Sequence, residues 1–326
     1  MGCVDIMLHV QLLKIFFHDE IMYMRKIILA GGTGNLGRLL AKEFNIQGYK
    51  VVLLTRNRNL KTDEQFIPVY WDGRQLGDWT AHLEQADAVV NLSGESIQCR
   101  YTEINKKLLI DSRVESTHNI GVAIQLAKLP PRLWINFSGV SIFENKPPFS
   151  TEESTVYADT FLAKLSKDWE QAFWDAKIAQ TKKICFRVSP VLSREFGMLQ
   201  ELYQLAKFGL AGTVGNGKQF VSWIHQEDFA RMVSWIVQHD APSSIYHACA
   251  PNAVTNKAFM SELRSTVSMP LGLPLPRFFA YIGAWAKGVE ANLLLDSTAV
   301  ISTQTLKDGF IFRYPTLDLA LKNLLS

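Results

Sequence analysis

The sequence predicts an α/β protein with a doubly wound, parallel Rossmann sheet and a small, mostly helical second domain. Three observations lead to this prediction. Short apolar, strand-like runs alternate with segments of helical spacing, the first run ends in a glycine-rich turn, and the alternation fades after about residue 190. Strands that alternate with helices form a parallel sheet whose two faces are both covered by helices.

The elements follow in chain order. The first strand is expected at 25–30, where an apolar run ends in the turn GGTGNLG. Leu39, Leu40 and Phe44 then show helical spacing, and Gly48 is a typical helix end. Further strands are expected at 50–55, 65–71, 87–92, 132–137 and 182–188, with helices at 103–128 and about 159–178. Later elements are helices at about 198–208, from about Gln226 and at 316–325, and a strand at 244–250.

Two domains are expected. Residues 24–190 form the cofactor-binding Rossmann domain, and residues 219–250 return to it with one helix and one strand. Residues 191–218 and 251–326 together form a smaller, substrate-binding domain. Because parallel sheets bind ligands outside the carboxyl ends of their strands, a ligand is expected in the crevice between the two domains.

The first 23 residues are expected to be a non-essential extension, because Met24 begins a typical first strand. Asp5, His9, Lys14 and Asp19 interrupt the segment well before it reaches membrane-spanning length. It also lacks the basic start and the small-residue cleavage site of a secretory signal.

The segment RFFAYIGAWAKG, at 277–288, is expected to be an aromatic helix. The spacing of its apolar residues predicts a buried amphipathic face, formed by Phe278, Phe279, Ile282, Trp285 and Ala286. One basic residue at each end is too little for a helix that lies on a membrane surface.

Composition excludes several classes of protein. Lys and Arg total 34 against 31 Asp and Glu, so the net charge of +3 argues against a dedicated nucleic-acid binder. The four cysteines, at positions 3, 99, 185 and 249, lack the paired spacing of a metal site or a disulfide scaffold. We therefore expect a cytoplasmic monomer or homodimer without a metal, acting on a small-molecule substrate rather than on nucleic acid or a membrane.

The glycine-rich turn predicts a dinucleotide site. Gly31 permits the tight turn, Gly34 lets the backbone approach a pyrophosphate, and Gly37 allows close packing of helix on strand. The helix N-terminus, at Asn35 and Leu36, offers unpaired N–H groups to the phosphates. The alternative is a simple glycine-rich turn in a flavodoxin-like domain.

The end of the second strand indicates NADP rather than NAD. The chain reads Thr55, Arg56, Asn57, Arg58, with no carboxylate until Asp63. Arg56 lies 19 residues after Gly37, where a carboxylate would select NAD and an arginine a 2′-phosphate. A guanidinium pairs with a phosphate through two parallel hydrogen bonds. The alternative is that Arg56 and Arg58 are solvated loop charges.

Several motifs resemble the extended short-chain dehydrogenase/reductase superfamily, namely GGTGNLG, the NLSGE of 91–95, the serine at 138 and RVSPVLS at 187–193. More narrowly, GNGKQFVSWIHQED at 215–228 and LKDGFIFRYPTLDLAL at 306–321 look like the atypical epimerase-family proteins. That group is often labelled nucleoside-diphosphate-sugar epimerase-like, and some members carry a cell-division-inhibitor label. The similarity runs from about Met24 to the C-terminus.

The resemblance implies a cofactor site formed by Gly31, Gly34, Asn35, Leu36, Gly37, Arg56, Asp72, Ser93, Gly94, Lys164, Pro190 and Val191. In such proteins Asp72 would contact adenine, and Ser93 and Gly94 would pass beneath the cofactor. Pro190 and Val191 would line the nicotinamide end. Ser138 would be the catalytic serine that polarises a substrate carbonyl or hydroxyl, and Lys164 the lysine that holds the nicotinamide ribose.

The chain departs from the superfamily at the catalytic tyrosine. The chemistry needs a tyrosine and a lysine four residues apart, so that both side chains reach one site. Four residues before Lys164 stands Thr160, whose hydroxyl is far too weakly acidic to act as a base. Relatives commonly carry another tyrosine soon after Ser138, where this chain has Ile142 and Phe143.

Other residues could replace the base, but each has a structural alternative. They are Glu144, Glu152, Glu153, Tyr157, Asp159 and His225. Loop carboxylates are usually solvated, Asp159 suits a helix N-cap, and Tyr157 shares a face with Lys164 only if the helix reaches back to it. His225 either faces the substrate or, with Asp228, caps the next helix.

The sequence therefore predicts an NADP-dependent oxidoreductase or epimerase of the extended short-chain type, acting on an unidentified substrate for which a sugar nucleotide is the candidate. The alternative is a catalytically lapsed NADP-binding protein that acts through a partner. Loss of the usual tyrosines favours the second reading, whereas retention of Ser138 and Lys164 favours the first.

Overall fold

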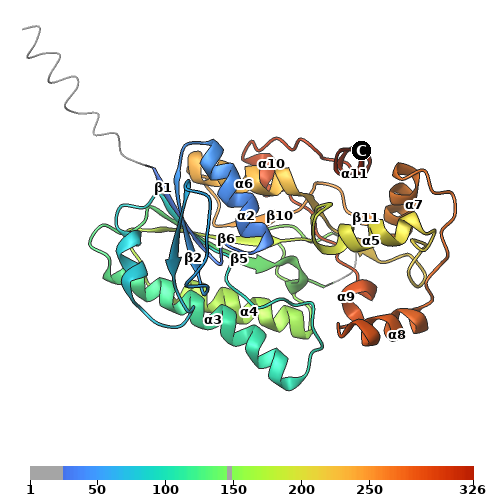
Figure 1. Ribbon diagram of the computed structural model, residues 1–326, viewed down its shortest axis with the longest axis horizontal. Coiled ribbons are helices and arrows are strands. Elements are labelled where there is room, and N and C mark those ends of the chain that lie inside the picture. The colour runs from blue at the N-terminus through green and yellow to red at the C-terminus, as the bar shows by residue number, and fades with distance from the viewer. Residues whose placement is uncertain (1–24, 145–148) are drawn as a thin grey trace, which may run out of the picture.

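A computed structural model describes residues 25–144 and 149–326 (Figure 1). The expected N-terminal extension, 1–23, lies outside the described residues, so its dispensability stays a prediction. The described chain forms one large sheet with helices on both faces and a group of further helices at one end of that sheet.

The central sheet has seven strands, and every neighbouring pair is parallel. They are β1 (Lys26–Ala30), β2 (Lys50–Thr55), β3 (Phe66–Tyr70), β4 (Ala88–Asn91), β5 (Leu133–Gly139), β6 (Lys182–Val188) and β10 (Ile245–Ala248). Their order is β3-β2-β1-β4-β5-β6-β10, so the direction of winding reverses between β1 and β4. The predicted fold class is confirmed, and this reversal is where such sheets bind their ligands.

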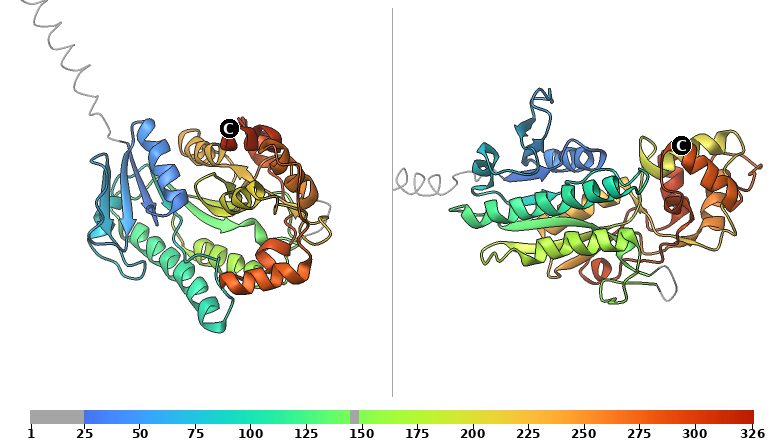
Figure 2. Two further views of the ribbon diagram at one scale, coloured as in Figure 1. Left: turned by 45° about the vertical axis from the view of Figure 1, so that its right-hand side comes forward. Right: turned by 90° about the horizontal axis from the view of Figure 1, so that it is seen from below.

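Two helical layers cover the sheet. Helices α2 (Asn35–Ile46) and α6 (Gln226–Gln238) lie on one face, and α3 (Glu103–Leu126) and α4 (Phe161–Asp175) lie on the other (Figure 2). Strand β1 shows why: Ile27 and Leu29 pack with the α2 and α6 residues, whereas Ile28 packs with those of α3. Successive residues of a strand point to opposite faces, so an unbroken apolar run is buried on both.

The helices beyond the carboxyl ends of the strands form a separate apolar core. They are α5 (Gly197–Lys207), α7 (Asn256–Thr266), α8 (Arg277–Lys287), α9 (Asn292–Leu295) and α11 (Leu317–Leu325). Smaller elements are the 3-10 helices η1 (Asp78–Leu83) and η2 (Val140–Ile142), the helix α10 (Gln304–Lys307) and the paired strands β7 (Val191–Leu192) with β9 (Ile224–His225) and β8 (Phe220–Val221) with β11 (Val254–Thr255).

Helix α8 forms where expected, but the prediction of its buried face is wrong. Phe278 and Trp285 are 68% and 69% exposed, and the buried residues are Ala280 and Ala284. These two alanines lie four residues apart on one face of the helix and join the separate apolar core. The helix therefore packs through its small residues and presents its large apolar side chains outward.

Candidate functional site

The glycine-rich turn lies at the point where the sheet reverses. Gly31 has a φ of +77°, which only glycine adopts without strain. A side chain there would stand 3.2 Å from backbone atoms of Leu92 and Ser93, so the turn after β1 touches the chain after β4. This close backbone contact lies beyond the carboxyl ends of β1 and β4.

Gly34 and Gly37 differ in their surroundings. A Cβ at Gly37 would lie 2.5 Å from the backbone of Gly32, so helix and turn pack too closely for any side chain. At Gly34 the nearest atom would be 3.6 Å away, which leaves room above the turn. No side chain caps the N-terminus of α2, and its first turn holds no acidic residue. The N–H groups at Asn35 and Leu36 can therefore meet an anionic group, and the turn fits a pyrophosphate.

Arg56 extends from the end of β2 toward the chain after β4. Its Nη1 lies 2.6 Å from Oε1 of Glu95, and both side chains are largely exposed. Arg58 is engaged elsewhere, because its guanidinium stacks 3.5 Å over the ring of Tyr70. Of the two arginines, Arg56 is the one that contacts the chain after β4, and its exposed guanidinium could also meet a phosphate.

Asp72 shapes the turn that follows β3. Its Oδ1 accepts hydrogen bonds from the backbone N–H groups of Arg74 and Gln75. The backbone N–H of Arg74 in particular holds the pKa of Asp72 below its usual range. The carboxylate therefore serves its own turn, and the contact with adenine that the resemblance implies stays a prediction.

Ser93 and Gly94 begin the loop after β4. The N–H of Ser93 donates to the buried side chain of Asn91, which fixes the direction of the loop. A Cβ at Gly94 would lie 2.8 Å from the guanidinium carbon of Arg113, so only glycine fits there. Burial lowers the pKa of Arg113 to about 10, and its Nη2 donates to the carbonyl of Glu95.

Ser138 stands at the end of β5, but its hydroxyl turns inward. The buried Oγ donates to Oε1 of Glu170 at 2.7 Å. Glu170 in turn binds Arg187 through two hydrogen bonds of 2.8 Å, from Nε and from Nη2. Because Arg187 is 2% exposed, this is a fully buried ion pair with the serine as its third member.

The buried group continues to the neighbouring strand. Arg187 of β6 stands beside Ser138 of β5 and beside His247 of β10. The Nδ1 of His247 donates to the carbonyl of Ile301 at 3.2 Å, and its backbone N–H donates to Glu152. Burial lowers the pKa of His247 to about 4, so the ring is neutral near pH 7. Among the described residues, Nη1 of Arg187 and Nε2 of His247 have no hydrogen-bond partner.

The start of α4 differs from the expectation. Thr160, not Asp159, is the N-cap, and its hydroxyl accepts from the N–H of Ala163. The expected cap was wrong by one residue. Lys164 lies on the exposed side, with its Nζ 2.9 Å from Asp168. Tyr157 precedes the helix and pairs with Phe143 in an isolated bridge, so it shares no helical face with Lys164.

His225 is buried and occupied on both ring nitrogens. Its Nδ1 accepts from the N–H of Glu227 and caps α6, so Nε2 carries the proton and donates to Asn323 of α11. Its ring also stacks on Tyr314 at 3.8 Å. Asp228 accepts the backbone N–H groups of Arg313 and Tyr314. These contacts agree with the alternative in which His225 caps the next helix. They also join the segments 215–228 and 306–321, which carry the resemblance to the atypical epimerase-family proteins.

Pro190 and Val191 connect β6 to the helices of the separate apolar core. The carbonyl of Pro190 accepts from the N–H of Ile224, and Val191 is buried in the short pairing of β7 with β9. Their predicted place beside a nicotinamide ring stays a prediction.

Sequence reasoning missed Glu170 and Arg187. The available signal was an arginine inside the apolar strand KKICFRV and a glutamate at a buried position of an amphipathic helix. Charged residues are rarely buried unless they are paired, so each of them implies a partner.

No helix within 25–144 and 149–326 is long and apolar enough to cross a membrane. In the same ranges, no three His, Cys, Asp or Glu side chains gather as a metal ion would need.

Comparison with known proteins identifies relatives. Epimerase family protein YfhF of Bacillus subtilis is 30% identical over 304 residues, which cover 92% of this chain and 98% of the relative. Epimerase family protein SDR39U1 of Homo sapiens is 29% identical over 92% of this chain and its own full length. A crystal structure of human SDR39U1 (isoform 2) with NADPH superposes with a TM-score of 0.81, at 28% identity, over 92% of this chain and 98% of that chain.

Models of two families match the chain. Residues 276–324 match a domain of unknown function, DUF1731, which includes the exposed helix α8. Residues 27–249, more than half of the chain, match the NAD dependent epimerase/dehydratase family. The switch-point glycines lie within this match, as does the buried group of Ser138, Glu170 and Arg187. The chain belongs to the NAD dependent epimerase/dehydratase family.

Proposed function

We propose that this protein is an NADP-dependent oxidoreductase or epimerase of the extended short-chain type, with a small-molecule substrate. The observation that carries the proposal is the switch-point turn, where Gly31 and Gly37 are required by packing and the end of α2 is open to a pyrophosphate. Arg56, at the end of β2, has an exposed guanidinium that contacts the chain after β4, and the related human protein was crystallised with NADPH. Among small molecules, we propose a sugar nucleotide as the substrate. We expect the protein to act in the cytoplasm.

Bound NADPH would supply a hydride at this site. The chain's own polar groups define what else it can do. The proton of Ser138 is directed to Glu170, so in this arrangement its oxygen can accept a hydrogen bond from a substrate hydroxyl. To polarise a carbonyl instead, the hydroxyl would have to rotate away from Glu170. Lys164 would have to leave Asp168 before its ammonium could reach a ribose.

The second candidate function is a catalytically lapsed NADP-binding protein that acts through a partner. Its support is that all three polar groups near the expected chemistry already have protein partners. Thr160 caps α4, Ser138 donates to Glu170, and Lys164 pairs with Asp168. The two candidates share the cofactor and differ in turnover.

Calorimetry with NADPH and NADH tests the cofactor assignment. We expect the wild type to bind NADPH more tightly, and Arg56→Ala to weaken NADPH binding by about tenfold to a hundredfold, since a charge-assisted hydrogen bond is lost. Arg58→Ala is the matched control, because that guanidinium lies over Tyr70. Equal affinity of the wild type for the two cofactors would refute the assignment.

A further inference from the structure

An ion pair joins the chain after β2 to the chain after β4. Nη1 of Arg56, the first residue beyond β2, lies 2.6 Å from Oε1 of Glu95, the fourth residue beyond β4. In the sheet these two strands stand on either side of β1. Because neighbouring strands lie roughly 5 Å apart, β2 and β4 are about 10 Å from each other. The two residues therefore come from opposite sides of the strand that ends in the glycine turn, and they meet each other.

The backbone of Glu95 is fixed by α3. Its N–H donates to Oγ of Ser112 at 3.0 Å, and its carbonyl accepts from Nη2 of Arg113 at 3.0 Å. Arg113 is buried and packs against Gly94, where a Cβ would lie 2.8 Å from its guanidinium carbon. The carboxylate of Glu95 therefore extends from a backbone whose two polar groups are both held by the neighbouring helix.

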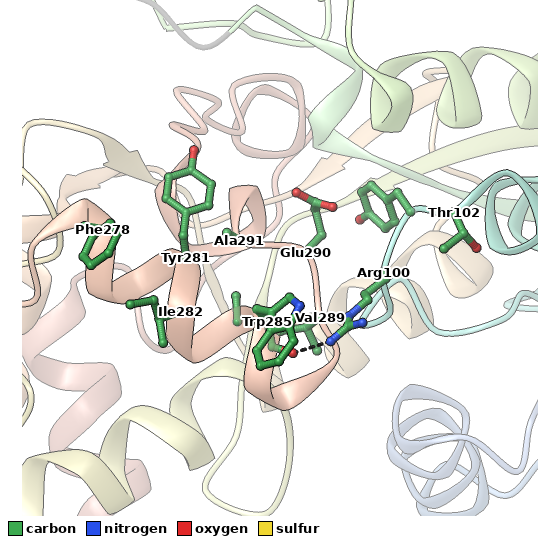
Figure 3. A pocket seen from close by; sticks show the side chains of 11 residues that line it. Arg100, Thr102, Phe278, Tyr281, Ile282, Trp285, Val289, Glu290 and Ala291 are labelled. Atoms are coloured by element: carbon green, nitrogen blue, oxygen red, sulfur yellow. Dashed lines mark hydrogen bonds between the residues drawn. The ribbon is translucent and has the colours of Figure 1, made fainter.

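The same loop is also fixed at its far end. Figure 3 shows Arg100 with its guanidinium at the end of α8, where Nη2 donates to the carbonyl of Trp285. The carbonyl of Arg100 accepts from Nδ2 of Asn105, in the first turn of α3. The loop between β4 and α3 thus contacts both helices, so the position of Glu95 is set by the fold around it.

The side chain of Arg56 is held less firmly. It is 72% exposed, against 42% for that of Glu95. In the part of the chain that the structure describes, Glu95 is the one residue that accepts a hydrogen bond from its guanidinium. A guanidinium has five N–H donors, so most of them stay open to a ligand. The carboxylate is therefore the fixed member of the pair, and the guanidinium is the member that a ligand can draw away.

The two side chains have opposite preferences for the adenosine ribose of a nicotinamide cofactor. An arginine pairs with the 2′-phosphate of NADPH, whereas a carboxylate suits the 2′-hydroxyl of NADH and repels a phosphate. This chain has no carboxylate at the end of β2, but Glu95 brings one to Arg56 from the loop after β4. The group that favours the phosphate and the group that opposes it thus stand together.

We propose that Glu95 is a specificity-determining residue of the cofactor site, which lowers the preference for NADPH over NADH. In the free protein its carboxylate holds Arg56, so the 2′-phosphate of NADPH must either displace the carboxylate from the guanidinium or bind beside it. NADH carries no 2′-phosphate and leaves the pair intact. The inference rests on the proposed function, because it requires that Arg56 meets the 2′-phosphate.

Calorimetry on Glu95→Gln tests the proposal. Glutamine has nearly the same shape, and the backbone hydrogen bonds with Ser112 and Arg113 stay available to it. We expect the variant to bind NADPH about two- to fivefold more tightly than the wild type, the fold-change that corresponds to an exposed ion pair. The affinity for NADH should change less. An NADPH affinity that is unchanged or weaker would overturn the proposal, as would an equal gain for NADH.

Glu103→Gln is the matched control for the change in net charge. Glu103 begins α3, its side chain is 90% exposed, and it pairs with Lys106 rather than with Arg56. We expect this substitution to leave the affinities for both cofactors unchanged. Equal gains in NADPH affinity in Glu103→Gln and Glu95→Gln would assign the effect to the overall charge of the protein and overturn the specific role of Glu95.

The double variant Arg56→Ala, Glu95→Gln shows whether Glu95 acts through Arg56. We expect the gain in NADPH affinity from Glu95→Gln to shrink when Arg56 is absent, because only direct repulsion of the phosphate is then relieved. An equal gain in both backgrounds would overturn the role of the pair. Failure of this inference alone leaves a wild type that prefers NADPH and an Arg56→Ala variant that has lost the preference. The proposed function fails separately, through equal affinities of the wild type for the two cofactors.

Discussion

The turn after β1 and the start of α4 are built in opposite ways. The turn is made of backbone packed on backbone, with Gly37 against Gly32 and Gly31 against the chain after β4. Around α4 the site depends on side chains, and each of them is held by another side chain or by the helix itself. A cofactor site made of backbone packed on backbone does not depend on side-chain partners for its shape. Catalytic side chains can instead be drawn into structural roles.

The largest loss of stability is expected from Glu170→Ala, which disrupts the buried group beside α4. The substitution leaves Arg187 buried without its carboxylate and Ser138 without its acceptor. Removing one partner of a buried ion pair typically costs about 3–5 kcal/mol of the free energy of unfolding. Chemical denaturation of the wild type and of Glu170→Ala measures this loss in the free energy of unfolding.

Asp168→Ala is the control for that substitution, two residues away on the same helix. It removes the exposed partner of Lys164, and exposed pairs contribute about 0–1 kcal/mol. Similar losses in the free energy of unfolding of the two variants would contradict the structural role that we assign to Glu170.

The different construction also explains what could be predicted from the sequence. The strands and the glycine turn were predictable because apolar runs and glycine spacing report directly on backbone packing. The inward turn of Ser138 was not, because it depends on Glu170 and Arg187, which lie 32 and 49 residues further along the chain. The buried face of α8 was predicted wrongly, since hydrophobic spacing shows that a helix has an apolar face and not whether that face is covered.

The next effect is a dependence of stability on pH, caused by His247, which lies beside Arg187 of the buried group. The pKa of His247 is lowered to about 4 by burial, from an ordinary value of 6.5. Between these two values the unfolded chain binds more protons than the folded chain, so the free energy of unfolding should fall as the pH drops from about 6.5 to about 4. A pKa difference of about 2.5, at about 1.4 kcal/mol for each pKa unit, gives a total of about 3.5 kcal/mol. Denaturant midpoints across this range measure it.

His247→Asn tests whether the histidine causes that slope. Asparagine can keep a donor for the carbonyl of Ile301 and does not titrate, so the pH dependence between 6.5 and 4 should flatten even if the variant is less stable throughout. An unchanged slope would assign the loss of stability to other groups.

A smaller effect is expected on the backbone side, from Gly37→Ala. A methyl group there would overlap the backbone of Gly32, so we expect a loss of about 1–3 kcal/mol of stability, as in other overpacked sites, together with loss of NADPH binding. Differential scanning calorimetry and NADPH titration report the two effects separately.

Gly34→Ala is the matched control at the same turn. The nearest atom to its methyl group would be 3.6 Å away, so the cost in stability should stay below about 1 kcal/mol, the scale of N-cap preferences. NADPH binding should still weaken, because the methyl group occupies the space above the turn. A variant that binds NADPH as the wild type does would show that no phosphate approaches Gly34.

Smaller changes in stability than that of Glu170→Ala are expected from the two residues that the family resemblance assigns to chemistry. Ser138→Ala removes one hydrogen bond to a carboxylate, worth about 1.5–3 kcal/mol, and Lys164→Ala removes one exposed ion pair, worth about 0–1 kcal/mol. Both variants should remain folded at 25 °C. They therefore separate catalysis from structure, which Glu170→Ala cannot do.

Turnover decides what these two side chains still do. With no phenol four residues before Lys164, we expect weak NADPH oxidation with UDP-sugar and simple carbonyl substrates, because general acid–base help contributes about 10²–10⁴ in rate. Any activity that is present should fall in both single variants, while the affinity for NADPH changes least in Ser138→Ala. Robust turnover in a Ser138→Ala, Lys164→Ala double variant would show that catalysis has moved to other groups.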